Sequence, residues 1–151
     1  MLRFALLAFW AVLFSSCLSE PDCVITASSE VKISFLKTKP DSVKTETADT
    51  VILDSIRIAG SDSVFYVGDT LSSVILPINV GGYETTLFFY LPSQQDSLKI
   101  AYTRSTRVIS PSCGAFNYFQ DLAVVSHSLP SVTVVNPQLS NSDAANLIIR
   151  W

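Results

Sequence analysis

Apolar and polar residues alternate along most of the chain after residue 23, and this period of two constrains the fold more than any other feature. Val31, Ile33 and Phe35 fall on one face of such a segment, with a lysine and a serine between them. Alternation of this kind predicts strands that are buried on one side. Residues with turn-forming chemistry separate the segments, at Pro40-Asp41, Gly60-Ser61, Gly81-Gly82 and Asn136-Pro137.

The alternating segments predict about eight or nine short strands in an all-β fold. After the N-terminal leader no segment sustains the 3.6-residue period of a helix, and 151 residues are enough for one ordinary domain. We therefore expect residues 24–151 to form a single antiparallel β-sandwich, with an immunoglobulin-like arrangement of its strands. The strands are expected at residues 24–36, 51–58, 63–67, 73–79, 85–91, 97–106, 117–125, 131–136 and 147–151.

Residues 1–16 have the pattern of a lipoprotein signal peptide. Arg3 gives a positive start, and Phe4–Phe14 is an apolar run of 11 residues, whereas a membrane-spanning helix needs about 20. Two serines precede Cys17, which resembles the lipobox of bacterial lipoproteins, although Phe14 stands where leucine is usual. Cys17 is therefore the candidate lipidation site, with ordinary secretion and a retained membrane anchor as alternatives.

A short polar tether, residues 17–23, joins this cysteine to the predicted domain. It contains Glu20 and Asp22, and an acidic tether so close to the lipid resembles the export signal of surface lipoproteins in the Bacteroidota. The alternative interpretation is a solvated linker. The predicted location is accordingly the cell outer membrane, with the protein lipid-anchored on the periplasmic face or at the cell surface.

The sequence has three cysteines, and acylation of Cys17 would leave Cys23 and Cys113 as an even pair in an oxidising compartment. We expect these two to form a disulfide bond, the alternative being two buried free thiols. The bond would close a loop of about 90 residues and contribute about 4 to 5 kcal/mol through chain entropy. A redox role is not expected, because the sequence has no CxxC motif that would lower a thiol pKa.

The sequence offers little for catalysis or for metal and cofactor binding. His127 is the only histidine, and neither the GxSxG motif of serine hydrolases nor a glycine-rich phosphate loop accompanies it. Zinc sites need several His or Cys ligands and calcium loops need clustered carboxylates, and the sequence has neither. We therefore expect no enzyme activity, no metal and no cofactor, and we interpret His127 as a surface residue.

Charge and aromatic content narrow the class of partner. The formal net charge is -3 and the chain has no run of lysine or arginine, so nucleic acid is not an expected partner, because phosphate binding needs a clustered basic face. A glycan is a possible partner, since exposed tyrosines can stack on sugar rings, although strand tyrosines are more often half-buried with a wet hydroxyl. The candidates are Tyr66, Tyr83, Tyr90, Tyr102 and Tyr118.

Several stretches of the chain together resemble one protein family. They are the leader ending at Cys17, Asp22-Cys23 before the first strand, Leu53–Ile56, the SPSCG loop Ser110–Gly114 and the closing strand after Asn136-Pro137. The chain resembles the DUF6452 family, a family of Bacteroidota lipoproteins of unknown function. The loop is the most specific part, although Ala115 separates its glycine from the phenylalanine that the family pattern has close by.

The resemblance implies an envelope lipoprotein and supports the pairing of Cys23 with Cys113. It implies no catalytic residue and no substrate. Together with the absence of an active-site motif, it leads us to expect an outer-membrane lipoprotein that acts as a non-catalytic binding or accessory module for another cell-envelope protein. The alternative is a surface glycan-binding lipoprotein.

Overall fold

The computed structural model describes residue 23 and residues 26–38 and 46–150. These residues form twelve β-strands and no helix, so none of them provides a helix long and apolar enough to span a membrane. Several predictions fall outside the described residues: the leader 1–16, the lipidation site Cys17, most of the tether 17–23 and the turn at Pro40-Asp41.

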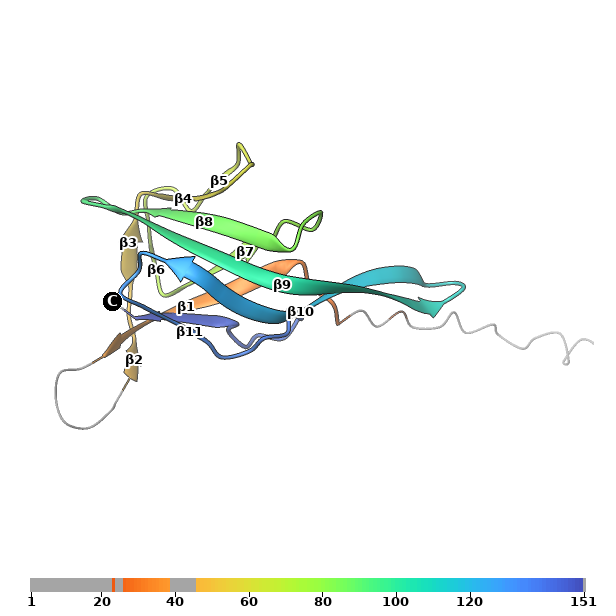
Figure 1. Cartoon of the computed structure of the whole chain (residues 1–151). Coiled ribbons are helices and arrows are strands. Elements are labelled where there is room, and N and C mark those ends of the chain that lie inside the picture. Colours follow the sequence, from red (N-terminus) through yellow and green to blue (C-terminus); the bar gives the residue numbers. More distant parts are fainter. Residues whose placement is uncertain (1–22, 24–25, 39–45, 151) are drawn as a thin grey trace, which may run out of the picture.

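Two five-stranded sheets and one small ribbon make up the fold (Figure 1). The first sheet contains β11 (Ser131–Val134), β12 (Leu147–Arg150), β1 (Glu30–Thr38), β2 (Glu46–Ala48) and β7 (Ser73–Pro77). The second sheet contains, in spatial order, β10 (Gly114–His127), β9 (Gln95–Ser110), β8 (Glu84–Tyr90), β4 (Ser55–Ile58) and β5 (Val64–Phe65). The ribbon pairs β3 (Val51–Leu53) with β6 (Asp69–Leu71).

The chain passes back and forth between the two sheets. β1 and β2 belong to the first sheet, β4 and β5 to the second, β7 to the first, β8 to β10 to the second, and β11 and β12 to the first again. Strand pairs are antiparallel except that β1 and β12 run parallel, with Ile33 opposite Leu147 and Phe35 opposite Ile149. The predicted all-β sandwich is confirmed, with this one parallel pair added to the expected antiparallel pattern.

One hydrophobic core lies between the sheets, and the alternation in the sequence explains which side chains fill it. Every second residue of the main strands is buried, because successive side chains of a strand point to opposite faces. Burying each such side chain contributes about 1.5 to 3 kcal/mol. The fully buried side chains include Val31, Ile33 and Phe35 of β1, Leu87 and Phe89 of β8, Leu98 and Ile100 of β9, and Leu147 and Ile149 of β12.

The segment predicted as one strand at residues 51–58 forms two strands in different sheets. The chain changes sheets at Asp54, whose N–H donates to the Tyr90 carbonyl at 2.8 Å and whose carbonyl accepts from Gly68 N–H at 3.1 Å. β3 therefore pairs with β6, while β4 pairs with β8 and β5. This division, together with the three-residue strands β2 and β6, gives twelve strands where about eight or nine were expected.

Candidate functional site

The last two strands of the second sheet extend beyond it as a two-stranded arm (Figure 1). β8 pairs with β9 only as far as Ala101, whereas β10 pairs with β9 all the way to Ser110. We call residues 103–118, which include the connecting turn 111–113, the arm. Residues 107–114 lie between the strands expected at 97–106 and 117–125, but most of them are strand, and only the turn is not.

Local sequence explains why the arm forms. Residues such as Thr103, Thr106 and Val108 are β-branched and favour extended backbone. Gly114 follows the turn with a φ of 77°, a conformation that glycine adopts without steric cost. The turn is closed further by the Cys113 N–H, which donates to the Ser110 hydroxyl at 3.0 Å.

A disulfide bond joins the tip of the arm to the start of the domain. The structure links Cys23 to Cys113, with Cα atoms 5.7 Å apart and 90 residues between them in sequence. The chain rejoins the body of the fold at Thr26, whose carbonyl accepts from Asn141 N–H at 3.1 Å. Because an isolated two-stranded ribbon is only marginally stable in water, this bond is the covalent support that the arm has at its free end.

The tip of the arm carries exposed apolar side chains and no acidic residue. The side chain of Val108 is 74% exposed and that of Ile109 is 41% exposed. Arg104 and Arg107 are the charged residues between 104 and 118. The Arg107 guanidinium lies over the Tyr118 ring at 5.1 Å from its centroid, a cation–π contact that holds its charge beside an aromatic surface.

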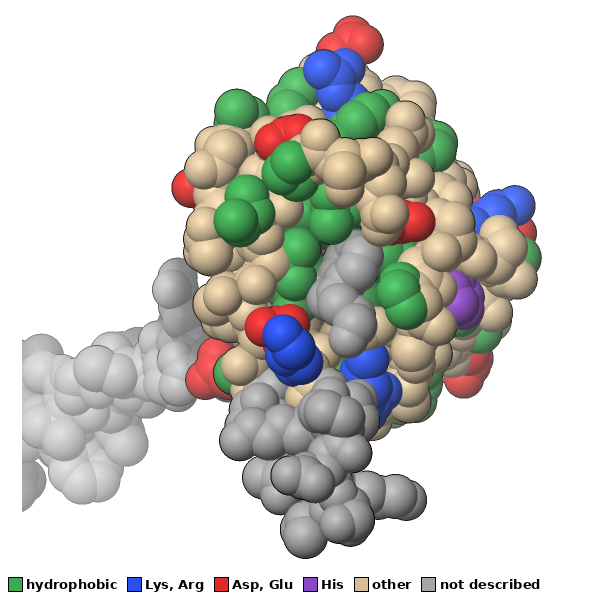
Figure 2. All heavy atoms as spheres, turned by 90° about the vertical axis from the view of Figure 1, so that its left-hand side faces the viewer, with side chains coloured by type: hydrophobic (Ala, Val, Ile, Leu, Met, Phe, Trp, Pro, Cys, Tyr) green, Lys and Arg blue, Asp and Glu red, His purple; other side chains and the backbone are tan. Residues whose placement is uncertain are grey.

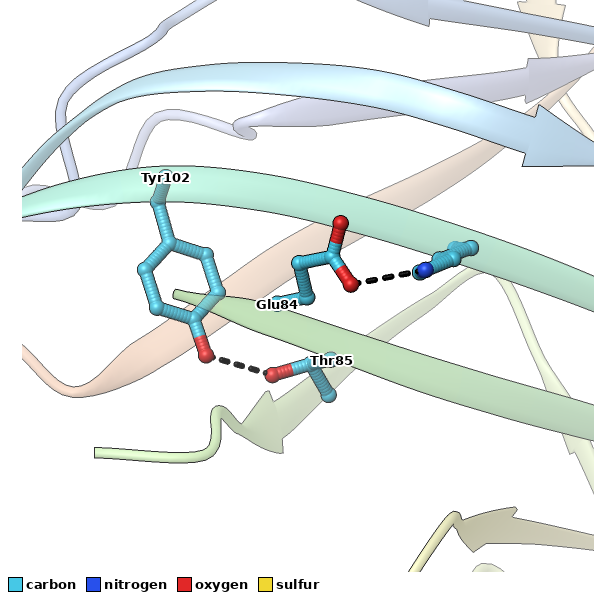
Figure 3. Close-up of polar contacts among 4 residues, drawn as sticks. Glu84, Thr85 and Tyr102 are labelled. Carbon is cyan, nitrogen blue, oxygen red and sulfur yellow. Dashed lines mark hydrogen bonds and ion pairs between the residues drawn. The ribbon is translucent and has the colours of Figure 1, made fainter. Parts of the chain in front are cut away.

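A buried polar cluster lies beside the base of the arm (Figure 3). The Tyr102 hydroxyl donates to the Asn79 carbonyl at 2.8 Å, and it lies 2.7 Å from Thr85 Oγ1. Thr85 Oγ1 in turn accepts from the Asn79 N–H at 2.8 Å. The two hydroxyl groups therefore fasten the segment after β7 to β8 and β9.

Burial raises the pKa of Tyr102 above its ordinary value of 10.0, because the phenolate would lose its hydration. The negative charge of Glu84 acts in the same direction, while the hydrogen bonds with Thr85 and Asn79 oppose it. Glu84 itself forms an ion pair with Lys99 at 2.7 Å (Figure 3). With its proton retained and its hydroxyl bonded on both sides, Tyr102 fits a structural role at the base of the arm.

A cavity of about 370 Å³ opens next to this cluster. Its walls come from the connection between β4 and β5 and from the end of β7, and they include Ile58, Ser61, Phe65, Pro77 and Asn79. None of the lining side chains is ionisable, so the cavity offers apolar surface and hydroxyl groups but no general acid or base.

His127 lies at the exposed end of β10, as the sequence predicted for its surface position. Its Nδ1 atom lies 2.8 Å from the Leu129 carbonyl, and the nearby Ser128 hydroxyl donates directly to the Asp96 carboxylate at 2.7 Å. These three side chains therefore do not line up in the serine–histidine–carboxylate order of a nucleophilic triad. Among the residues that the structure describes, no group of three or more His, Cys, Asp or Glu residues is placed to hold a metal ion.

The five candidate tyrosines have different surroundings. Tyr102 is buried, and Tyr66, Tyr90 and Tyr118 are half-buried. Tyr83 is 61% exposed, but the Arg104 guanidinium lies 5.7 Å from its ring centroid and donates to the Val80 carbonyl at 2.8 Å. The structure thus brings Tyr83 close to an arginine and does not gather the five rings into one aromatic platform.

Tyr66 has a function in the fold that the sequence did not reveal. Its hydroxyl donates to the Ile75 carbonyl and accepts from the Ile75 N–H, each at 3.0 Å. The Tyr66 hydroxyl therefore satisfies the N–H and the carbonyl of Ile75 on the outer edge of β7. Pro77, further along the same strand, has no N–H to offer. Capping of this kind protects an edge strand from pairing with other chains.

The other sheet edges differ in how they are covered. The Leu122 N–H donates to the Pro137 carbonyl, and the Leu139 N–H donates to the Phe119 carbonyl. The segment 137–139 therefore covers part of the β10 edge. β11 is at the end of the first sheet and pairs with β12 on one side. Its sequence, Ser131-Val132-Thr133-Val134, is β-branched and uncharged, which makes it the least protected of these edges.

Fold and geometry together define a small all-β sandwich protein with a disulfide-tied arm. The chain belongs to the family of unknown function DUF6452, which matches residues 42–150, more than half of its length. The match includes Cys113 and begins after Cys17 and Cys23. Neither the curated proteins nor the solved structures contain a match to the chain. The family membership predicted from the sequence is confirmed, while lipidation and bacterial group stay predictions.

Proposed function

We propose that the protein is a lipoprotein of the outer membrane, anchored through Cys17, whose sandwich domain is a non-catalytic binding or accessory module for another cell-envelope protein. The observation that carries the proposal is the disulfide between Cys113 at the arm tip and Cys23. Cys23 follows Cys17 by six residues. The domain would therefore be held at one end, with its sheet edges available to a partner.

The disulfide supports an exported location, because such bonds form and persist in oxidising compartments and are rare in the cytosol. The leader 1–16 agrees with export, since its apolar run has the length of a signal sequence. Anchoring on the periplasmic face or on the cell surface is equally compatible with the tether.

The edge of β11 is the surface that best fits a protein partner. A strand with unpaired backbone groups can accept a further strand from another chain, and main-chain hydrogen bonds then supply the affinity. β7 is capped by Tyr66 and β10 is partly covered by residues 137–139. Of these three edges, β11 is the one open to such pairing, and its four residues make it longer than the terminal strands β2 and β5.

Pull-down of the lipidated chain from detergent-solubilised envelopes tests this proposal. The wild type should recover a specific envelope protein. Thr133→Lys places a charge on the exposed side of β11 and removes the hydroxyl that accepts from Arg150 at 2.9 Å; it should recover roughly tenfold less, equivalent to about 1.4 kcal/mol. Thr70→Lys is the matched control, because Thr70 is equally exposed on β6 and should leave recovery unchanged.

Two results would contradict the proposal in different ways. A wild-type protein that emerges without any specific partner would remove the accessory role. Equal recovery by Thr133→Lys and the wild type would show that the partner does not use the β11 edge.

A further inference from the structure

The tip of the arm is tied to the N-terminal end of the domain as well as to its own strands. Six peptide units separate Cys17 from Cys23, and an extended chain of that length spans at most roughly 22 Å. The disulfide places the Cα atom of Cys113 a further 5.7 Å away. If Cys17 is acylated, as proposed above, the arm tip cannot lie more than roughly 28 Å from the lipid attachment point.

The arm is about as long as that tether, so its tip lies within reach of the membrane, together with residues 26–27 and 140–141 at the same end of the body. Residues 103–110 of β9 span roughly 23 Å at 3.3 Å per residue. The arm projects from one end of the sandwich (Figure 1). An arm directed toward the bilayer would bring its turn to the lipid surface while the sheets remain farther away.

The chemistry of the tip suits a lipid surface. Val108 and Ile109 are adjacent, 74% and 41% exposed, and Pro111 beside them is exposed as well. Single exposed apolar residues are ordinary, but a group of them at the end of a projecting turn marks a contact surface. Arg107 lies between this tip and the half-buried Tyr118 ring, which is opposite Ser105 nearer the base of the arm.

Charges of both signs meet at this end of the molecule. Residues 104–118 contain two arginines and no acidic residue, while Glu20 and Asp22 precede Cys23 in the tether. The opposite end of the molecule, which faces the viewer in Figure 2, shows acidic and basic side chains interspersed with separate hydrophobic patches. Anionic phospholipids attract basic residues that lie within a Debye length of the surface, so Arg107 is the group of the arm that such a bilayer would attract.

We propose that the arm tip docks onto the phospholipid surface that holds the lipid of Cys17. Val108 and Ile109 enter the headgroup region, and Arg107 lies against the lipid phosphates. The lipid and the arm then form two attachments at one end of the domain. Two attachments would fix the orientation of the domain and keep β11 accessible to the partner.

Tryptophan fluorescence of the lipidated full chain in vesicles tests the docking. The vesicles contain phosphatidylethanolamine and phosphatidylglycerol with brominated acyl chains, which quench tryptophans that enter the bilayer. We expect the brominated chains to quench roughly half of the fluorescence that the new tryptophan of Ile109→Trp adds, because an interfacial side chain reaches the boundary of the acyl chains. Val125→Trp is the matched control, because Val125 is 51% exposed on the part of β10 outside the arm, and it should not be quenched.

Intact mass of the same samples separates failure of the docking from failure of the anchor. A lipidated protein with no quenching at residue 109 would overturn the docking and leave the anchor in place. Equal quenching at residues 109 and 125 would also overturn it, since contact would not be confined to the tip. A mass without lipid would overturn both the anchor and the docking that rests on it.

Discussion

Single buried polar residues join segments of this protein that are distant in sequence. The Asn146 side chain, 2% exposed, accepts from the Lys32 N–H at 2.9 Å and donates to the Gln138 carbonyl at 2.8 Å. It also donates to the Asn136 carbonyl at 3.2 Å. One amide therefore connects β1 with the chain between β11 and β12, at the place where the parallel pair of strands begins.

Tyr102 has a comparable role at the base of the arm. Its ring packs edge-on against Phe119, with centroids 5.7 Å apart, while its hydroxyl bonds Asn79 and Thr85. Tyr102→Phe keeps the ring and removes the hydroxyl. We expect it to lower the free energy of unfolding by about 1 to 2 kcal/mol, the usual cost of leaving buried partners unpaired, as measured by urea denaturation.

Tyr83→Phe is the control for that loss. Its side chain is 61% exposed, and removal of an exposed hydroxyl should change the free energy of unfolding by less than about 0.5 kcal/mol. Equal effects of the two substitutions would show that the buried cluster contributes nothing particular to stability.

The raised pKa of Tyr102 also predicts how stability depends on pH. The unfolded chain releases the phenol proton near pH 10.0, whereas burial keeps it bound in the folded protein to higher pH. Above pH 10.0 the folded state therefore binds more protons, and the free energy of unfolding falls as pH rises. Tyr102→Phe lacks this contribution, so its difference from the wild type should shrink above pH 10.0 in denaturation curves. A constant difference would contradict the raised pKa.

Among the elements, the arm is the one whose stability depends most on a covalent bond. Its two strands have each other as strand neighbours over residues 103–110 and 114–118, and two-stranded ribbons are marginal without support. The disulfide supplies that support at the tip. Its loss should therefore affect the arm before it affects the sandwich core.

Cys113→Ser should release the arm. By the chain-entropy estimate, loss of a bond that spans 90 residues lowers the free energy of unfolding by about 4 to 5 kcal/mol. In hydrogen exchange, the amides of residues 103–110 and 114–118 should lose protection, while those of β8 in the sheet keep theirs. Ser112→Ala, at the exposed neighbouring position, should leave both sets unchanged. Arm amides that remain protected in Cys113→Ser would show that the ribbon stands without the bond.

For the whole molecule, local patterns predicted which faces are buried but not which strands meet. The alternation at Val31, Ile33 and Phe35 predicted the buried face of β1, and the strand expected at residues 85–91 is β8, which lies in the middle of its sheet. The parallel pairing of β1 with β12 was not predictable, because pairing across more than 100 residues depends on packing and not on local preference.

The arm shows a second limit of sequence reasoning. Residues 107–114 contain serine, proline and glycine, which indicate a loop, and only pairing with β10 extends the strand to Ser110. Within the strand expected at residues 117–125, the pairing with β9 has a register shift between Gln120 and Ala123. The edge cap by Tyr66 could not be foreseen, since it depends on a hydroxyl reaching a strand of the other sheet.

Only one part of the candidate site, the disulfide bond, could be predicted from the sequence. The pair Cys23 and Cys113 was proposed by counting cysteines, and the structure contains that bond. The exposed tip at Val108 and Ile109 and the open edge of β11 gave no sequence signal, because exposure depends on which strands end beside others.

Intact mass of the membrane-purified protein, before and after reduction, tests most directly the claim that the domain is anchored through Cys17 and stapled through Cys23 and Cys113. We predict a mass equal to residues 17–151 plus an attached lipid, with a gain of one hydrogen at each sulfur of the disulfide on reduction. An unlipidated mass that begins at another residue would contradict the anchor, and with it the envelope role built on that anchor.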